Sequence, residues 1–284
     1  MAGPAPASFD WDGVPIDSES EAARMAERAG QRQLVRKGKP CMTGHARREA
    51  TEAEGVRVQL SLPDHDRVFA VLAFCIALLL LASAAVVAAS RMAGAVDSPW
   101  VLLVSVNAES NIPTWFSIVL LAAGSGLAWI VRRADRTRGA GAPAPWGWIA
   151  ALLAFLSLDE CAGLHEAVGR NLVGLIEAEG VLYFRWVVVG APVALAAVLV
   201  LAWLERGLPR SDRIRLATAF TIYFGGAVIL EAIGGVLADD HGRRSLAAMA
   251  SIHAEEGMEM LGAALIVRAL LARLREVAGL ARPA

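Results

Sequence analysis

Two stretches, WIAALLAFLSLDECAGLHEAVG at 148–169 and LAAMASIHAEEGMEMLGAALIV at 246–267, decide the fold class. Each is long enough to cross a membrane as a helix, which takes about 20 mainly apolar residues. Each also carries several ionisable side chains, which a helix surrounded by lipid does not tolerate. The two stretches therefore predict membrane-spanning helices that turn their polar side chains toward other helices.

Four more stretches are long enough to span a membrane, and they also predict membrane-spanning helices. Residues 68–90, 112–131 and 186–204 contain no charged side chain, and 216–238 contains only Glu231. The chain is 56% hydrophobic, with a mean hydropathy of +0.49. We therefore predict an all-α polytopic membrane protein with six transmembrane helices at 67–274, between a largely disordered tail at 1–66 and a short tail at 275–284.

Arginines alternate between the connections and predict the orientation. Four arginines lie in each of the segments 132–138, 206–215 and 268–282, whereas the intervening connections carry one or two each. By the positive-inside rule, both termini are cytoplasmic, in agreement with an even number of spans. The expected location is the cytoplasmic membrane. No basic block indicates binding to nucleic acid.

The ionisable residues inside the spans are confined to the third, fifth and sixth. A charged side chain near a helix centre costs roughly 2.5–3.5 kcal/mol, so such a set points to a functional site. With about 1.5 Å of rise per residue, all of them lie between the midplane and the predicted outer surface. They are Asp159, Glu160, His165 and Glu166, then Glu231, then His253, Glu255, Glu256 and Glu259.

Helical phase indicates which of these side chains share a face. Asp159 and Glu166 are seven apart and fall on one stripe, and His253, Glu256 and Glu259 step along one arc. The fifth span has glycines on both sides of Glu231, which favours close packing against a neighbouring helix. We therefore expect one shared site that is open toward the outer side.

Carboxylates packed together need compensation by metal ions, shared protons or arginines. Oxygen ligands with one or two imidazoles suit Zn, Mn, Fe or a similar divalent metal. Our first hypothesis is a metal-dependent membrane hydrolase or oxidoreductase, with Glu255 and Glu160 as catalytic groups and a lipid or small molecule from the outer side as its substrate. The candidate metal ligands are Asp159, His165, Glu166, Glu231, His253, Glu256 and Glu259.

Two other functions use the same residues. Six spans divide into two sets of three, in which the acidic third and sixth spans are counterparts, as in the inverted repeats of many carriers. Protonatable carboxylates from midplane to surface suit a proton- or cation-coupled transporter. In the third reading, the acids bind a partner subunit and only stabilise an assembly.

The strings LSLDECAGLHE at 156–166 and EEGMEMLG at 255–262 resemble helices of uncharacterised bacterial six-span membrane proteins. That resemblance covers the third and sixth spans and implies no activity. A weaker likeness connects the chain with membrane hydrolases of the alkaline ceramidase and adiponectin-receptor type, which are helical and hold an intramembrane zinc. Their paired histidines four apart are missing here, so no zinc ligand is transferred from them.

Polar residues outside the spans have two interpretations. Glu109 precedes the second span, and Asp239, Asp240 and His241 follow the fifth. All of them are expected in outer connections, where they are either solvated or extend the site.

Overall fold

The computed structural model describes residues 62–94, 98–138 and 144–279, and these residues are helical, with no β-strand among them. Most of the predicted tail at 1–66, and residues 280–284, lie outside the described part. The elements are α3 (His65–Ala93), α4 (Pro99–Val104), α5 (Ile112–Arg138), α6 (Ala144–Ala162), α7 (Leu164–Asn171), η1 (Gly180–Leu182), α8 (Val187–Leu204), η2 (Glu205–Gly207), α9 (Arg210–Phe224), the π-helical η3 (Gly225–Leu230), α10 (Glu231–His241) and α11 (Leu246–Val277).

The all-helical class is confirmed, and the helices are compatible with a multi-pass membrane protein. Four helical stretches are long and apolar enough to cross a membrane, namely α3, α5, α8 and the run from α9 to α10, and the bent pair of α6 and α7 would make a fifth. The predicted sixth span corresponds to α11, which has 32 residues but carries too many charged side chains to belong to that apolar class.

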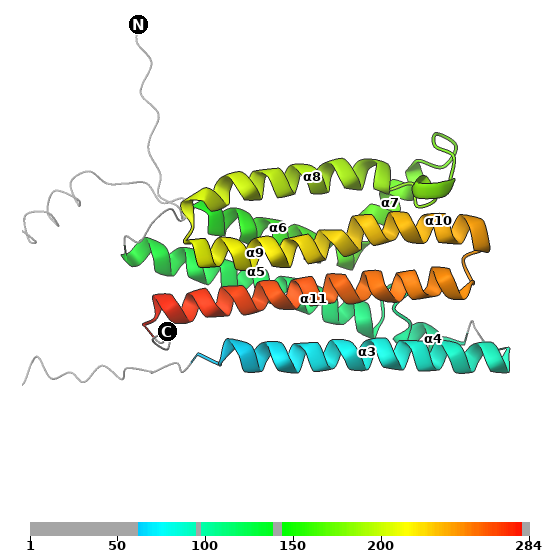
Figure 1. Ribbon diagram of the computed structural model, residues 1–284, viewed down its shortest axis with the longest axis horizontal. Helices are drawn as coiled ribbons and strands as arrows, with labels where there is room; N and C mark the ends of the chain where they lie inside the picture. Colours follow the sequence, from blue (N-terminus) through cyan, green and yellow to red (C-terminus); the bar gives the residue numbers. More distant parts are fainter. Residues whose placement is uncertain (1–61, 95–97, 139–143, 280–284) are drawn as a thin grey trace, which may run out of the picture. The chain divides into compact units, whose positions relative to one another are not determined.

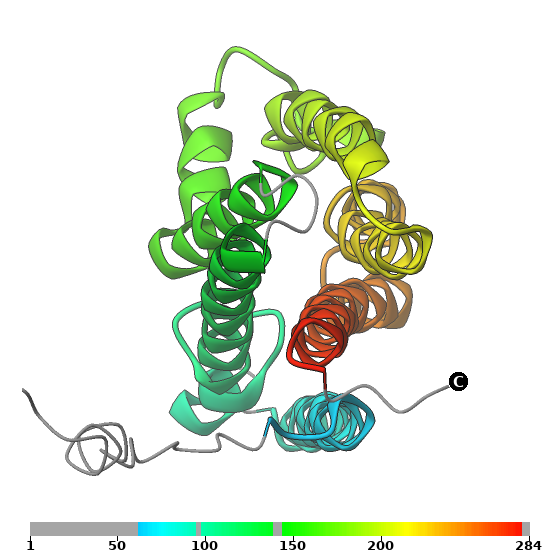
Figure 2. The same cartoon turned by 90° about the vertical axis from the view of Figure 1, so that its left-hand side faces the viewer.

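Helix α11 is the central element of the bundle. It packs against α3, α5, α9 and α10, and the long helices run side by side (Figure 1). Viewed along the bundle, α3 lies at one edge and α8 at the other, with α5 and α6 facing α9, α10 and α11 (Figure 2). Small residues allow this position, since Gly262, Ala263 and Ala264 of α11 are all buried.

Two predicted spans are interrupted, and both interruptions lie near acidic residues. The span at 148–169 breaks at Gly163, whose φ of +58° is easily adopted only by glycine, and the two helices differ in direction by 63°. In the fifth span, residues 225–230 form a π-helix directly before Glu231. Such π segments change the direction of the side chains that follow and are frequent at functional sites.

Glycines bring α9 and η3 into close contact with α11. A Cβ atom on Gly262 would lie 2.6 Å from the backbone nitrogen of Tyr223, and one on Gly226 would lie 2.8 Å from the carbonyl oxygen of Glu255. A Cβ atom on Gly126 of α5, by contrast, would have no neighbouring atom within 4 Å. Helices α9 and η3 therefore approach α11 at a distance that only glycine permits.

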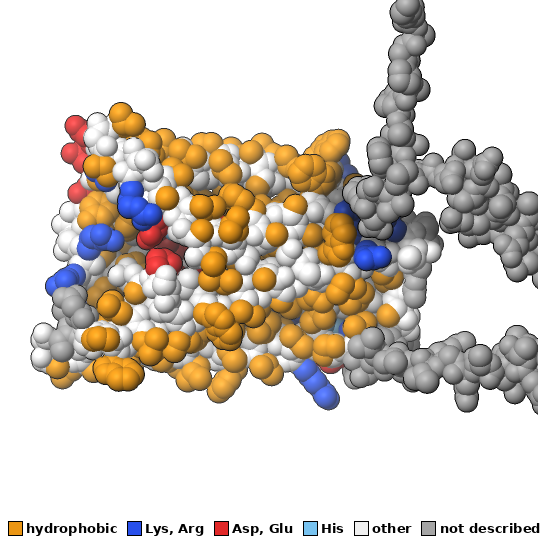
Figure 3. Space-filling model, turned by 180° about the vertical axis from the view of Figure 1, so that it is seen from behind, with side chains coloured by type: hydrophobic (Ala, Val, Ile, Leu, Met, Phe, Trp, Pro, Cys, Tyr) orange, Lys and Arg blue, Asp and Glu red, His pale blue; other side chains and the backbone are white. Residues whose placement is uncertain are grey.

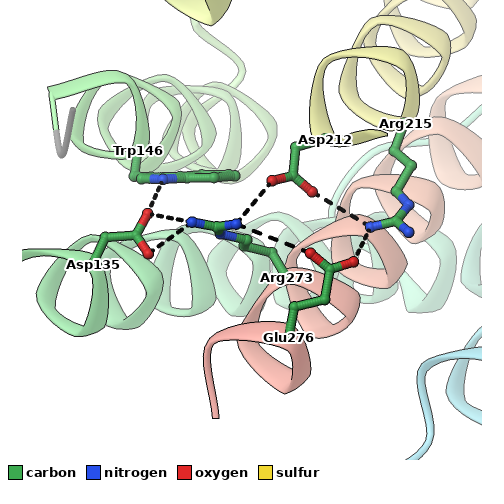
Figure 4. Close-up of polar contacts among 6 residues, drawn as sticks. All are labelled: Asp135, Trp146, Asp212, Arg215, Arg273 and Glu276. Carbon is green, nitrogen blue, oxygen red and sulfur yellow. Dashed lines mark hydrogen bonds and ion pairs between the residues drawn. The ribbon is translucent and has the colours of Figure 1, made fainter. Parts of the chain in front are cut away.

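Opposite the break in α6, an ion network ties α5, α6, α9 and α11 together (Figure 4). The guanidinium of Arg273 lies 3.0 Å from Asp135 and 3.5 Å from Asp212, and these two aspartates are only 3% and 1% exposed. The indole N–H of Trp146 donates to Asp135 at 2.8 Å. Arg215 and Glu276 complete the network with an ion pair of 2.9 Å.

The glycine contact predicts the effect of one methyl group. Gly262→Ala should lower the melting temperature of the detergent-solubilised protein, because overpacking against a backbone costs about 1–3 kcal/mol. Gly126→Ala is the matched control and should leave it unchanged or raise it, since alanine favours helix. Equal melting temperatures for the two variants would contradict the close approach.

The ion network predicts a larger effect. Arg273→Gln leaves the buried Asp135 without its cation and leaves Asp212 with only Arg215 at 3.4 Å. Breaking a buried pair costs about 3–5 kcal/mol. We expect a large loss of thermal stability, partly regained by adding Asp135→Asn, while Arg136→Gln at an exposed position has little effect. A wild-type melting temperature for Arg273→Gln would show that the network does not hold the helices.

Candidate functional site

A cavity of about 690 Å³ lies among α6, α7, α8, η3, α10 and α11, near the break in α6. Acidic side chains from all the predicted acidic spans reach it, together with one from the loop before α5. The eight carboxylates that line it are Glu109, Asp159, Glu160, Glu166, Glu231, Glu255, Glu256 and Glu259. The structure thus brings all seven carboxylates singled out in the sequence to one cavity and adds Glu109.

His165 and Asp159 form a pair at the break between α6 and α7. One oxygen of Asp159 accepts the backbone N–H of His165 at 2.9 Å, and the other lies 2.9 Å from Nδ1 of the same residue. The carboxylate therefore satisfies the first turn of α7 and also orients the imidazole. When Nδ1 carries the proton, Nε2 presents a lone pair for a proton or a metal ion.

Trp186 connects this pair to Glu231. Its ring centroid lies 5.1 Å from that of His165, and its indole N–H donates to Glu231 at 2.9 Å. The ring lies over Gly190 of α8, where a Cβ atom would be 2.0 Å from the indole. Gly190 therefore makes room for the tryptophan that fixes Glu231.

The acids of α11 lie beside those of the other helices. Glu255 lies beside Glu231, and Glu256 and Glu259 line the same cavity as Glu160. Within the described residues, Glu256 and Glu259 have no hydrogen bond or ion pair. Their carboxylates are therefore available to a ligand in the cavity.

His253 does not join this group, contrary to the helical-phase argument. Its Nε2 lies 3.1 Å from the hydroxyl of Ser83 in α3, and its Nδ1 lies 2.9 Å from the carbonyl oxygen of Met249. The arc of His253, Glu256 and Glu259 is wide enough that its first member faces α3 while the acids face the cavity. His253 has both ring nitrogens engaged in helix packing.

Arginines line only part of the cavity. Arg170 pairs with Glu166 at 3.1 Å, whereas Arg185 donates to the carbonyl oxygen of Ile176 and Arg243 lies over the ring of Phe184. Three arginines against eight carboxylates leave a large excess of acidic groups. Within the described ranges, no three His, Cys, Asp or Glu side chains are arranged so that they could hold a metal ion as they stand.

Glu109 is the lining acid that the sequence left ambiguous. It lies in the connection between α4 and α5, outside the predicted spans. Burial raises the pKa of its carboxyl above the usual range, and the nearby Glu166 adds to the effect. In the sequence, Glu109 was visible only as an acid in an outer connection. No local pattern indicated that this loop lines the cavity.

One family profile matches the chain, over residues 60–274, and it describes a domain of unknown function, DUF8692. The match covers every predicted span. No curated protein and no solved structure matches the chain.

The raised pKa of Glu109 gives a pH-dependent prediction. An acid whose pKa is higher in the folded state stabilises the fold below its unfolded pKa, and this contribution disappears as the pH rises through the folded value. Glu109→Gln mimics the protonated form, so it should melt above the wild type at about pH 8, with the difference closing at about pH 5. A difference that does not change with pH would contradict the burial of an ionisable Glu109.

Proposed function

The chain belongs to the family described as a domain of unknown function (DUF8692), and we propose that it is a metal-dependent membrane hydrolase. The supporting observation is the cavity, which gathers eight carboxylates and His165 but only three arginines. Several of these carboxylates come from helices that also carry spanning-length apolar sequence. This excess of acid needs compensation, which a bound cation would supply.

The proposal includes the six-span topology. Counting α11 as the sixth span gives both termini a cytoplasmic location, consistent with the arginine-rich connections. The network of Arg273 then lies on the cytoplasmic side, and the cavity lies in the outer half of a cytoplasmic membrane. A ligand would reach the cavity from the outer side or from the outer leaflet.

Charge compensation is the physical basis of the cation. Arg170 already pairs with Glu166, and Arg185 and Arg243 cannot neutralise the remaining acids. Carboxylates left together in a low-dielectric interior either take up protons or bind a cation. Glu160, Glu256 and Glu259 line the cavity together and form the proposed ligand group.

The His165–Asp159 pair supports catalysis rather than simple binding. An imidazole held at Nδ1 by a carboxylate is oriented to accept a proton at Nε2, the arrangement used for general bases. A divalent Zn, Mn or Fe ion supplies a more acidic bound water. Asp159 is then a positioning residue, and Glu231 and Glu255 complete the acidic wall beside Trp186.

Proton- or cation-coupled transport is the second candidate, and the ion network favours it. The network of Asp135, Trp146, Asp212 and Arg273 joins four helices at the end of the bundle opposite the break in α6. A cavity held shut on one side and open on the other matches one state of an alternating-access carrier.

Elemental analysis of the purified protein tests the proposal. We expect a stoichiometric divalent metal that is lost from Glu256→Gln and Glu259→Gln, because each removes a ligand charge. Glu177→Gln, an exposed acid that does not line the cavity, should retain the metal. Protein that neither contains nor takes up Zn, Mn or Fe would overturn the proposal, and proton-linked cation flux in proteoliposomes would then support the carrier.

A further inference from the structure

We infer that the ligand of the cavity is a phospholipid of the outer leaflet, which enters sideways between α6 and α8. Its phosphate would lie at Arg185 and Arg243, and one acyl chain would lie along the inner side of α8. The inference rests on the proposed function, because it names the substrate class of that site.

The size of the cavity indicates a ligand much larger than a bare ion. A water molecule occupies about 30 Å³ of liquid, so 690 Å³ corresponds to roughly 20 waters. Sites for organic ligands typically measure about 300–1,000 Å³. A cation held by a few carboxylates leaves most of this space unfilled.

The walls away from the acids are apolar. Helix α6 contributes Leu152, Phe155 and Leu156, and α8 contributes Val189 and Val193. Phe155, Val189 and Val193 are 48%, 42% and 53% exposed although they line the cavity. The apolar part of the cavity is therefore continuous with the hydrophobic flank of the bundle, where acyl chains lie in a membrane.

Helix α8 makes a suitable side of such an opening because it packs loosely. Only Val187 and Leu201 of its 18 residues are buried. Viewed along the bundle, it occupies one edge, away from the central α11 (Figure 2). Its contacts with α6, α7, α9 and η3 are few compared with those of α11, so separation from α6 disturbs little of the core.

Acidic side chains are also visible on the apolar surface of the bundle. On the face seen from behind, acidic side chains are recessed within a flank that is mostly hydrophobic, and Lys or Arg side chains lie beside them (Figure 3). An acidic group visible from the lipid-facing side is costly unless something polar approaches it from there. The headgroup of a lipid is such a partner.

Charge complementarity selects a phosphate-bearing lipid. Within the described residues, Arg185 and Arg243 line the cavity without a carboxylate partner, although acids are plentiful nearby. Guanidinium groups bind phosphate through paired hydrogen bonds. A metal ion at the carboxylates and two arginines would hold a phosphate from both sides, whereas an uncharged lipid would leave the arginines unused.

Native mass spectrometry of protein released from lipid nanodiscs tests this inference. The nanodiscs contain phosphatidylglycerol and phosphatidylethanolamine, with diacylglycerol as the uncharged lipid. We expect one tightly retained phospholipid per protein. Val193→Trp fills the apolar wall, and Arg243→Gln removes a phosphate contact without disturbing a buried residue, so each should reduce retention about tenfold, equivalent to roughly 1.4 kcal/mol.

Val198→Trp is the matched control, because Val198 is an exposed valine of α8 that does not line the cavity. It should retain the lipid as the wild type does. Equal retention in Val193→Trp and Val198→Trp, equal retention of diacylglycerol, or displacement of the lipid by inorganic phosphate alone would overturn the inference. Metal analysis of the same samples separates the two proposals. Metal without retained lipid would support the hydrolase and overturn the lipid ligand, whereas retained lipid without metal would support the lipid ligand and overturn the metal-dependent hydrolase.

Discussion

The structure depends on one electrostatic constraint, the placement of eight carboxylates around a cavity inside a bundle of apolar helices. Burying each of these charges destabilises the folded protein, and apolar packing does not compensate for the lost hydration. The group is therefore stable only when its members bind protons or a cation. The few nearby arginines do not meet that need. We propose that a bound cation is the reason why these side chains occur together.

The helices around the cavity deviate from regular geometry where the acids require it. Gly163 ends α6 so that Asp159 can hold His165, and the π segment before Glu231 turns the carboxylate toward Trp186. Glycine contacts bring α9 and η3 close to α11. At the other end, the buried Arg273 network fixes the same helices. The acidic end can therefore be irregular without loosening the bundle.

Hydropathy patterns in the sequence were enough to predict the helical class and the approximate positions of the long helices, because such patterns are local. They also identified seven of the lining acids. Helical phase was less reliable, since it assumes straight helices and cannot tell which neighbour a wide arc faces. Gly163 broke one stripe, and His253 turned toward Ser83.

Other features depend on contacts between distant segments and have no local signature. Glu109 reaches the cavity only because its loop folds over it, and Arg273 counted in the sequence merely as one of several cytoplasmic arginines. Its partner Asp135 lies 138 residues away. The pairing of Trp186 with Gly190 likewise becomes visible only in three dimensions.

The most direct measurement is anomalous X-ray diffraction at the manganese edge from crystals of the protein grown with Mn²⁺. The account predicts an anomalous peak inside the cavity, between the carboxylates of α6 and those of α11. A cavity without a peak, or a peak only on the surface of the bundle, would contradict the claim that these acids exist to hold a cation.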